Sequence, residues 1–196
     1  MQVRKTMAIA MAVATILGAL VLLVWGMLFW GVLYEPAAVF KPDVVDEEIV
    51  HALEQSGIAT GTYFHPWPRN TPEARQSWVT RHAAGPFFRL SYVREGVDPQ
   101  SPAKLLRGVG HNLAIALLAT WLVVFTQAAA TTFGKRVLLV FVAGSMGTLM
   151  TLAGDVVWFH MPADYAVGAA VYELGCWLLL GLVLAWYLQP RRLAPE

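Results

Sequence analysis

The sequence predicts a helical membrane protein with four transmembrane helices and a small α/β domain inserted between the first and second helices. Two observations lead to this prediction. The chain is 57% hydrophobic and only 14% charged, whereas soluble domains have about 25% charged residues. The charge is also uneven, because most of it lies between Glu35 and Arg107 while long stretches elsewhere carry none. Apolar spans joined to one polar segment explain both features.

Four segments are long enough to cross a bilayer, whose core of roughly 30 Å needs about 20 apolar residues in a helix. They run from about Met7 to Leu33, Gly108 to Ala128, Val137 to Phe159 and Tyr165 to Leu188. The first has a far longer apolar run than the roughly 7–15 residues of a signal peptide, so we expect it to remain as an anchor. The chain is then divided into residues 1–33, with the first span; 34–107, the polar domain; 108–188, with three spans; and 189–196, a tail.

Short basic flanks predict the orientation of the spans. In a four-span chain all of these flanks fall on one side, and they are Arg4 and Lys5, Lys135 and Arg136, and Arg191 and Arg192. Positively charged flanks stay in the cytoplasm, so we expect both termini there and residues 34–107 on the opposite side. The polar domain has no cysteine and no glycosylation sequon, which fits the periplasmic side of a bacterial inner membrane.

The polar domain has the pattern helix, strand, helix, strand. A helix begins at Asp43, continues to about Leu53 and ends before Gly57, whose freedom of conformation suits a helix end. A second helix begins at Thr71, where a capping side chain precedes a proline, and it continues to about Ala84. Each helix is followed in the sequence by a run of β-branched or aromatic residues. These runs predict strands over Ile58–Phe64 and Phe87–Val93.

The two strands and the helix between them predict a parallel pair with a right-handed crossover. In the second strand, Phe88, Leu90 and Tyr92 alternate with their neighbours, which predicts one buried face. Two strands form a poor sheet by themselves. We therefore expect the domain either to pair with another protein or to be supported by its own helices.

Two acidic residues, Asp155 and Glu173, lie within the predicted spans, where charge is costly and marks a functional candidate by default. At helical spacing, each acid shares a face with small or hydroxylated residues. Such faces suit helix contact rather than lipid, so we expect both acids to point into the bundle. The companions are Ala166, Ala169, Ala170 and Cys176 for Glu173, and Gly144, Gly147, Thr148 and Thr151 for Asp155.

His111 in the second span and His160 in the outer turn are expected at a similar depth. His111, Asp155, His160 and Glu173 therefore form a candidate site in the outer leaflet. Two histidines and two carboxylates suit a metal ion or a proton relay. The alternative is structural, with the acids paired to Arg107, His111 or His160 so that they fix the helix contacts. The sequence contains no ligand motif such as His-Glu-x-x-His, so it requires no metal or other cofactor.

The sequence has no phosphate-binding glycine loop, nucleophile elbow or Cys-x-x-Cys pair. We therefore expect a non-enzymatic accessory or assembly subunit of a larger membrane complex. Its partners are the lipid bilayer and either another membrane protein or a second copy of the chain. The net charge of +1 gives no reason to expect nucleic acid. The alternative is a metal- or proton-handling protein that uses the four candidate residues. A membrane enzyme acting on a lipid or a quinone also stays open.

Overall fold

The computed structural model describes residues 2–33, 47–67 and 70–189 of the chain. Residues 34–46, where the first helix of the polar domain is predicted to begin, lie outside the described residues, as do Arg191 and Arg192. The chain forms two compact units. The larger comprises residues 1–42 and 100–196, and the smaller comprises residues 43–99.

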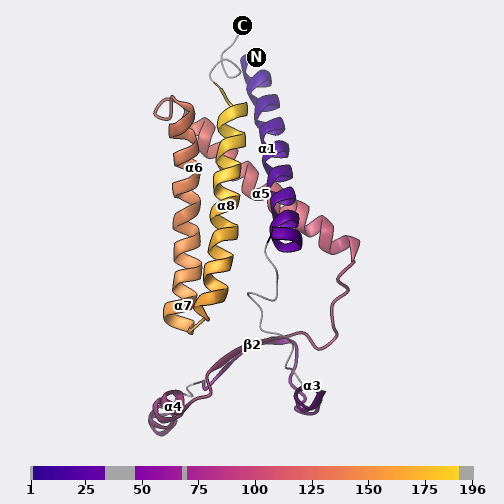
Figure 1. Cartoon of the computed structure of the whole chain (residues 1–196), viewed down its shortest axis with the longest axis vertical. Coiled ribbons are helices and arrows are strands. Elements are labelled where there is room, and N and C mark those ends of the chain that lie inside the picture. Colours follow the sequence, from indigo (N-terminus) through magenta and orange to yellow (C-terminus); the bar gives the residue numbers. More distant parts are fainter. Residues whose placement is uncertain (1, 34–46, 68–69, 190–196) are drawn as a thin grey trace. The chain divides into compact units, whose positions relative to one another are not determined.

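The larger unit contains, among the described residues, four helices that are long and apolar enough to cross a membrane. The hydropathy prediction of four such helices is therefore confirmed, and each predicted boundary agrees with the structure to within six residues. The helices, seen in Figure 1, are α1 (Gln2–Leu28), which continues as the π-helix η1 (Phe29–Leu33); α5 (Pro102–Phe125); α6 (Phe133–Thr148), which continues through the π-helix η2 (Leu149–Ala153) and α7 (Gly154–Phe159); and α8 (Ala163–Tyr187).

The largest boundary difference is at the start of α5, which begins at Pro102 rather than near Gly108. Proline suits the first turn of a helix because its missing N–H group would have no partner there. The added turns carry Lys104 and Arg107, and both side chains are exposed. The sequence-based boundary falls after these turns because their two charges interrupt the apolar run.

The two ends of the bundle are distinguished by their connections (Figure 1). The start of α1, the α5–α6 connection and the end of α8 lie together at one end, here called the Arg136 end. The α7–α8 turn lies at the other, the His160 end. At the Arg136 end, the buried Arg136 donates from Nε to the carbonyl of Ala130 (2.9 Å) and from Nη1 to the carbonyl of Leu188 (2.6 Å). A cation at the carboxyl end of α8 also complements the helix dipole.

The core of the bundle lies where α6 packs along α8 and where α1 packs against both α5 and α8. Its buried side chains include Ala14, Ala116, Val140, Leu180 and Leu184. Small residues allow transmembrane helices to approach closely. The closest such contact is at Gly144 of α6, where a Cβ atom would overlap the indole ring of Trp177 on α8.

The π-helix η2 changes which residues of the third span share a face. A π-helix closes its hydrogen bonds from residue i to i+5, so it adds one residue relative to an α-helix. The side chains after η2 are therefore rotated relative to those before it. Asp155 lies two residues beyond η2, so the α-helical spacing that groups it with Thr148 and Thr151 does not apply there.

The smaller unit contains the predicted order of helix, strand, helix and strand. These elements are α3 (Glu47–Gln55), β1 (Gly61–His65), α4 (Pro72–Ala84) and β2 (Phe88–Tyr92). The expected cap of α4 is present, because the Thr71 hydroxyl accepts a hydrogen bond from the Ala74 N–H group (3.2 Å). Gly57, beyond α3, and Gly85, beyond α4, both have positive φ, as expected for glycines that end helices.

The predicted parallel pairing is wrong, because β1 and β2 are antiparallel, with Gly61 opposite Tyr92 and His65 opposite Phe88. The crossover rule applies when a helix covers the face of a sheet. Here Figure 1 shows α3 and α4 at opposite ends of the two-stranded ribbon. Without a covered face, the chain returns directly beside β1 in the antiparallel pairing, which is slightly more stable per residue.

The predicted buried face of β2 is also wrong. Among the described residues of the smaller unit, only Pro66 is buried. Leu90 and Tyr92 are half-buried and Phe88 is 46% exposed, because neither described helix of the unit packs as a layer over the strands. The clearest packing contact is at the end of β1, where the Trp78 indole N–H of α4 donates to the carbonyl of Pro66 (2.9 Å).

Candidate functional site

A cavity of about 370 Å³ lies among α1, α5, the α6–η2 segment and α8, and it combines polar and apolar walls. We call it the Glu173 pocket. The apolar walls come from Leu22, Ile115 and Trp177. The other lining residues are His111, Asn112, Gly147, Thr148, Thr151, Tyr172, Glu173 and Cys176. A mainly apolar cavity with a few polar groups is the usual form of a small-molecule site.

Glu173 is ten residues beyond the start of α8 at Ala163, or about 15 Å along the helix. Its side chain is half-buried, and its Oε2 atom accepts a hydrogen bond from the hydroxyl of Thr148 (2.8 Å). In the described part of the chain, no lysine, arginine or histidine forms an ion pair with Glu173. One neutral hydroxyl is therefore the carboxylate's hydrogen-bond partner within the span.

His111 and Asn112 contribute polar groups to the pocket from a different helix. Both lie on α5, about one helical turn beyond Arg107. None of the described residues forms a hydrogen bond with either side chain. An imidazole and an amide can each donate and accept, so this wall can adapt to ligands of different hydrogen-bonding character.

The structure brings together two of the four residues predicted as a site. His111 and Glu173 line the same pocket, whereas Asp155 and His160 do not. Asp155 is displaced because η2 interrupts the α-helical spacing on which the prediction depends. His160 ends α7 in the left-handed conformation, with φ of 53°, and it is exposed. Among the described residues, no three histidine, cysteine or acidic side chains form a group that could hold a metal ion.

Several pocket residues were not among the predicted site residues. Thr148 was predicted to share a face with Asp155, but it bonds to Glu173 instead. Tyr172 and Trp177 also line the pocket. Tyr172 directly precedes Glu173, where spacing gives no signal, whereas Trp177 follows Glu173 by four residues. Neighbours at i+4 lie on the same face of a helix, so Trp177 could have been found from spacing alone.

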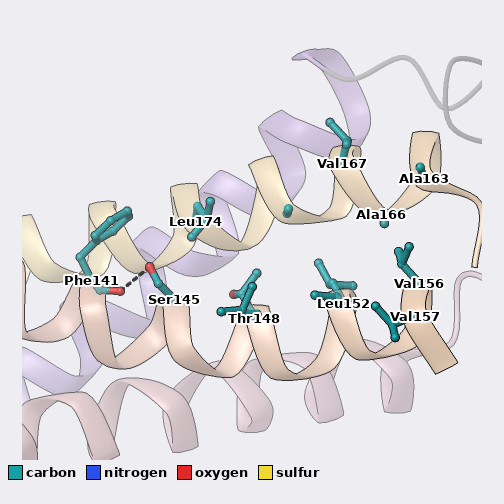
Figure 2. A pocket seen from close by; sticks show the side chains of 13 residues that line it. Phe141, Ser145, Thr148, Leu152, Val156, Val157, Ala163, Ala166, Val167 and Leu174 are labelled. Atoms are coloured by element: carbon teal, nitrogen blue, oxygen red, sulfur yellow. Dashed lines mark hydrogen bonds between the residues drawn. The ribbon is translucent and has the colours of Figure 1, made fainter.

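A second cavity, of about 640 Å³, lies between the α6–η2–α7 segment and α8 (Figure 2). Its walls are apolar side chains such as Leu152, Val156 and Leu174, which face the cavity from both sides. The Ser145 hydroxyl donates to the carbonyl of Phe141 (2.7 Å) in its own helix, so it presents no available donor. Thr148 lines this apolar groove as well as the Glu173 pocket, so the Thr148–Glu173 bond lies beside both.

The fold and the pocket place the chain in the class of helical integral membrane proteins, with a small two-stranded sheet in a separate unit. Comparison with protein-family models, with curated proteins and with solved structures gives no match.

Proposed function

We propose that the protein is a non-enzymatic accessory or assembly subunit of a larger membrane complex, and that its smaller unit binds the partner protein. The observation that carries the proposal is the open face of the β1–β2 ribbon. Alternate residues of paired strands share a face, so the register places Tyr63, His65, Phe88, Leu90 and Tyr92 together. We call this set the ribbon face.

The ribbon face is rich in aromatic side chains, and none of the described elements of the smaller unit covers it. His65 and Phe88 stack on it with ring centroids 5.2 Å apart, and none of its five residues is buried. A lone two-stranded ribbon is marginally stable in water. Binding a partner would bury these side chains, and it would also satisfy the free edge of a strand if the partner adds a strand of its own.

The orientation is part of the same proposal. The exposed Lys135 and the buried Arg136 are in the first turn of α6, and the α5–α6 connection before them lies at the same end of the bundle as the start of α1 (Figure 1). Following the rule that basic flanks stay in the cytoplasm, we assign that end to the cytoplasm. The smaller unit is then on the outer side, which is the periplasm if the membrane is a bacterial inner membrane. The partner accordingly has a domain on that side.

The proposal is tested by site-specific photo-crosslinking in intact membranes. A photoreactive residue at Phe88 should crosslink to one defined protein, which should also co-purify in mild detergent. The matched control is the same probe at Arg89, the next residue of β2, which is exposed on the opposite face. Equal crosslinking from both positions, or a protein that purifies alone, would overturn the proposal. Crosslinks to lipid alone would show that the ribbon face rests on the bilayer.

The Glu173 pocket favours a second candidate function, in which the protein handles protons. An acidic side chain within a span, hydrogen-bonded to a neutral hydroxyl, is a group that can take up and release a proton. Reconstituted vesicles should then show proton movement that the Glu173→Gln substitution abolishes. Unchanged proton movement in that variant would assign Glu173 to helix packing.

A further inference from the structure

The carboxylate of Glu173 lies in an apolar span and lacks a cationic partner among the described residues. Acidic groups within membrane spans usually pair with a cation or line an aqueous path, because an isolated charge in an apolar medium is costly. The hydroxyl of Thr148 satisfies one carboxylate oxygen, but it adds no positive charge. A ligand that enters the adjacent pocket can provide that charge.

The walls of the pocket indicate the kind of cation. Two aromatic side chains, Tyr172 and Trp177, line the cavity together with Glu173. The Tyr172 ring also packs against Phe29 and Trp30 of η1, so it forms a fixed aromatic wall that suits the apolar groups of an organic cation. The cavity of about 370 Å³ also falls within the roughly 300–1,000 Å³ of small-molecule sites. A proton alone would need neither aromatic walls nor this volume.

A metal ion does not fit these walls. His111, Glu173 and Cys176 line the same cavity, but among the described residues no three such side chains form a group that could hold a metal ion, and metal ions prefer several ligands at once. The apolar residues Leu22 and Ile115 instead suit hydrocarbon groups attached to the charge. We propose that the Glu173 pocket binds a lipophilic organic monocation of the ammonium or phosphonium type. Its charge pairs with Glu173, and its apolar groups contact Tyr172 and Trp177.

This inference does not depend on the proposed function of the smaller unit, since a subunit of a complex and a protein acting alone can both carry the pocket. The probe for its test is tetraphenylphosphonium, a lipophilic cation that cannot donate a hydrogen bond. Tetraphenylborate is the matched control, because it has the same shape and the opposite charge. Both ions partition into detergent micelles. Binding is therefore measured by equilibrium dialysis of the purified full chain in detergent, and the uptake by micelles without protein is subtracted.

The wild-type protein should bind about one tetraphenylphosphonium per chain in a saturable manner, while tetraphenylborate should show partitioning alone. This comparison needs no variant, so it does not depend on whether a substituted protein folds. Absence of saturable binding of the phosphonium would overturn the proposal. Saturable binding of both ions with equal affinity would overturn it too, because the pocket would then recognise shape and not charge.

Three variants test whether the negative charge that binds the cation belongs to Glu173. Glu173→Gln should weaken phosphonium binding at least about tenfold, since it removes the charge next to the ligand. Asp155→Asn removes the same charge from a span residue outside the pocket, and it should bind as the wild type does. Glu173→Asp, which keeps the charge, should retain saturable binding. Unchanged binding by a folded Glu173→Gln variant, or equal losses in the Asn and Gln variants, would overturn the assignment.

Discussion

The hydroxyl of Thr148 donates a hydrogen bond of 2.8 Å to the carboxylate of Glu173, which joins the last residue of α6 to α8. Thr148 directly precedes the π-helix η2. The bond therefore fixes the third span to the fourth at the point where the third departs from α-helical geometry.

Replacing Thr148 by valine keeps the side-chain shape and removes the donor. We expect the free energy of unfolding in detergent to fall by about 1 kcal/mol, which is typical of one hydrogen bond between helices. Thermal unfolding measures the change. The control is Ser145→Ala, one turn earlier on α6, because the Ser145 hydroxyl donates only within its own helix. Equal losses in the two variants would contradict the prediction.

Replacing Gly144 by alanine should loosen the contact between α6 and α8, because the new Cβ atom would overlap the Trp177 indole. We expect a loss of roughly 1–3 kcal/mol, the usual cost of overpacking. Gly147→Ala is the control three residues along the same helix, since a Cβ at Gly147 meets nothing within 4 Å. That control should be neutral or slightly stabilising. A tolerated Gly144→Ala substitution would show that the two helices do not pack as described.

Replacing Arg136 by methionine should leave the carbonyls of Ala130 and Leu188 without their donors at the Arg136 end. Arg136 is 2% exposed, so we expect a loss of about 2–4 kcal/mol in unfolding free energy. Lys135→Met is the matched control, because it removes the same charge from an exposed neighbour. If both substitutions had the same effect, Arg136 would act only as part of a basic flank.

Glu95 lies beyond β2, and its carboxylate accepts a hydrogen bond of 2.7 Å from the Thr60 hydroxyl. This bond lowers the pKa of Glu95 below its usual 4.5. A lowered pKa means that the ionised group stabilises the folded unit above pH 4.5, and that this contribution is lost as the pH falls through the lowered value. Thr60→Val should raise the pKa of Glu95 toward 4.5, as measured by NMR titration of the carboxyl carbon.

Thr62→Val is the control for that titration, because Thr62 lies on β1 and is paired with Ser91 rather than with Glu95. The pKa of Glu95 should not change in this variant. A Thr60→Val protein in which the pKa of Glu95 also stays where it was would show that another group determines it.

The features of the fold that depend on local sequence were predictable. Four helices follow from apolar runs of sufficient length, and α4 follows from the capping threonine Thr71 and the glycine Gly85 that ends it. These signals are contained in a few adjacent residues. The identity of the element, and often its first or last residue, can therefore be derived without knowing what packs against it.

The features that depend on distant contacts were not predictable in the same way. The parallel strand pairing was wrong because the direction of β2 depends on whether another layer packs on the ribbon. The sequences of the two strands contain no information about that layer. Asp155 was grouped with Thr148 because the sequence of η2 carries no signal that separates a π-helix from an α-helix. The acid that does lie beside Thr148 is Glu173, 25 residues later in the sequence.

The antiparallel register limits how the smaller unit can vary in length. Gly61 lies opposite Tyr92, so the chain enters and leaves the ribbon at the same end. Side chains alternate between the two faces of a strand. An insertion that lengthens each strand by one residue would thus carry His65 and Phe88 to the opposite side, whereas an insertion of two in each would return them. Evolutionary change in the length of this ribbon should therefore occur in steps of two residues per strand.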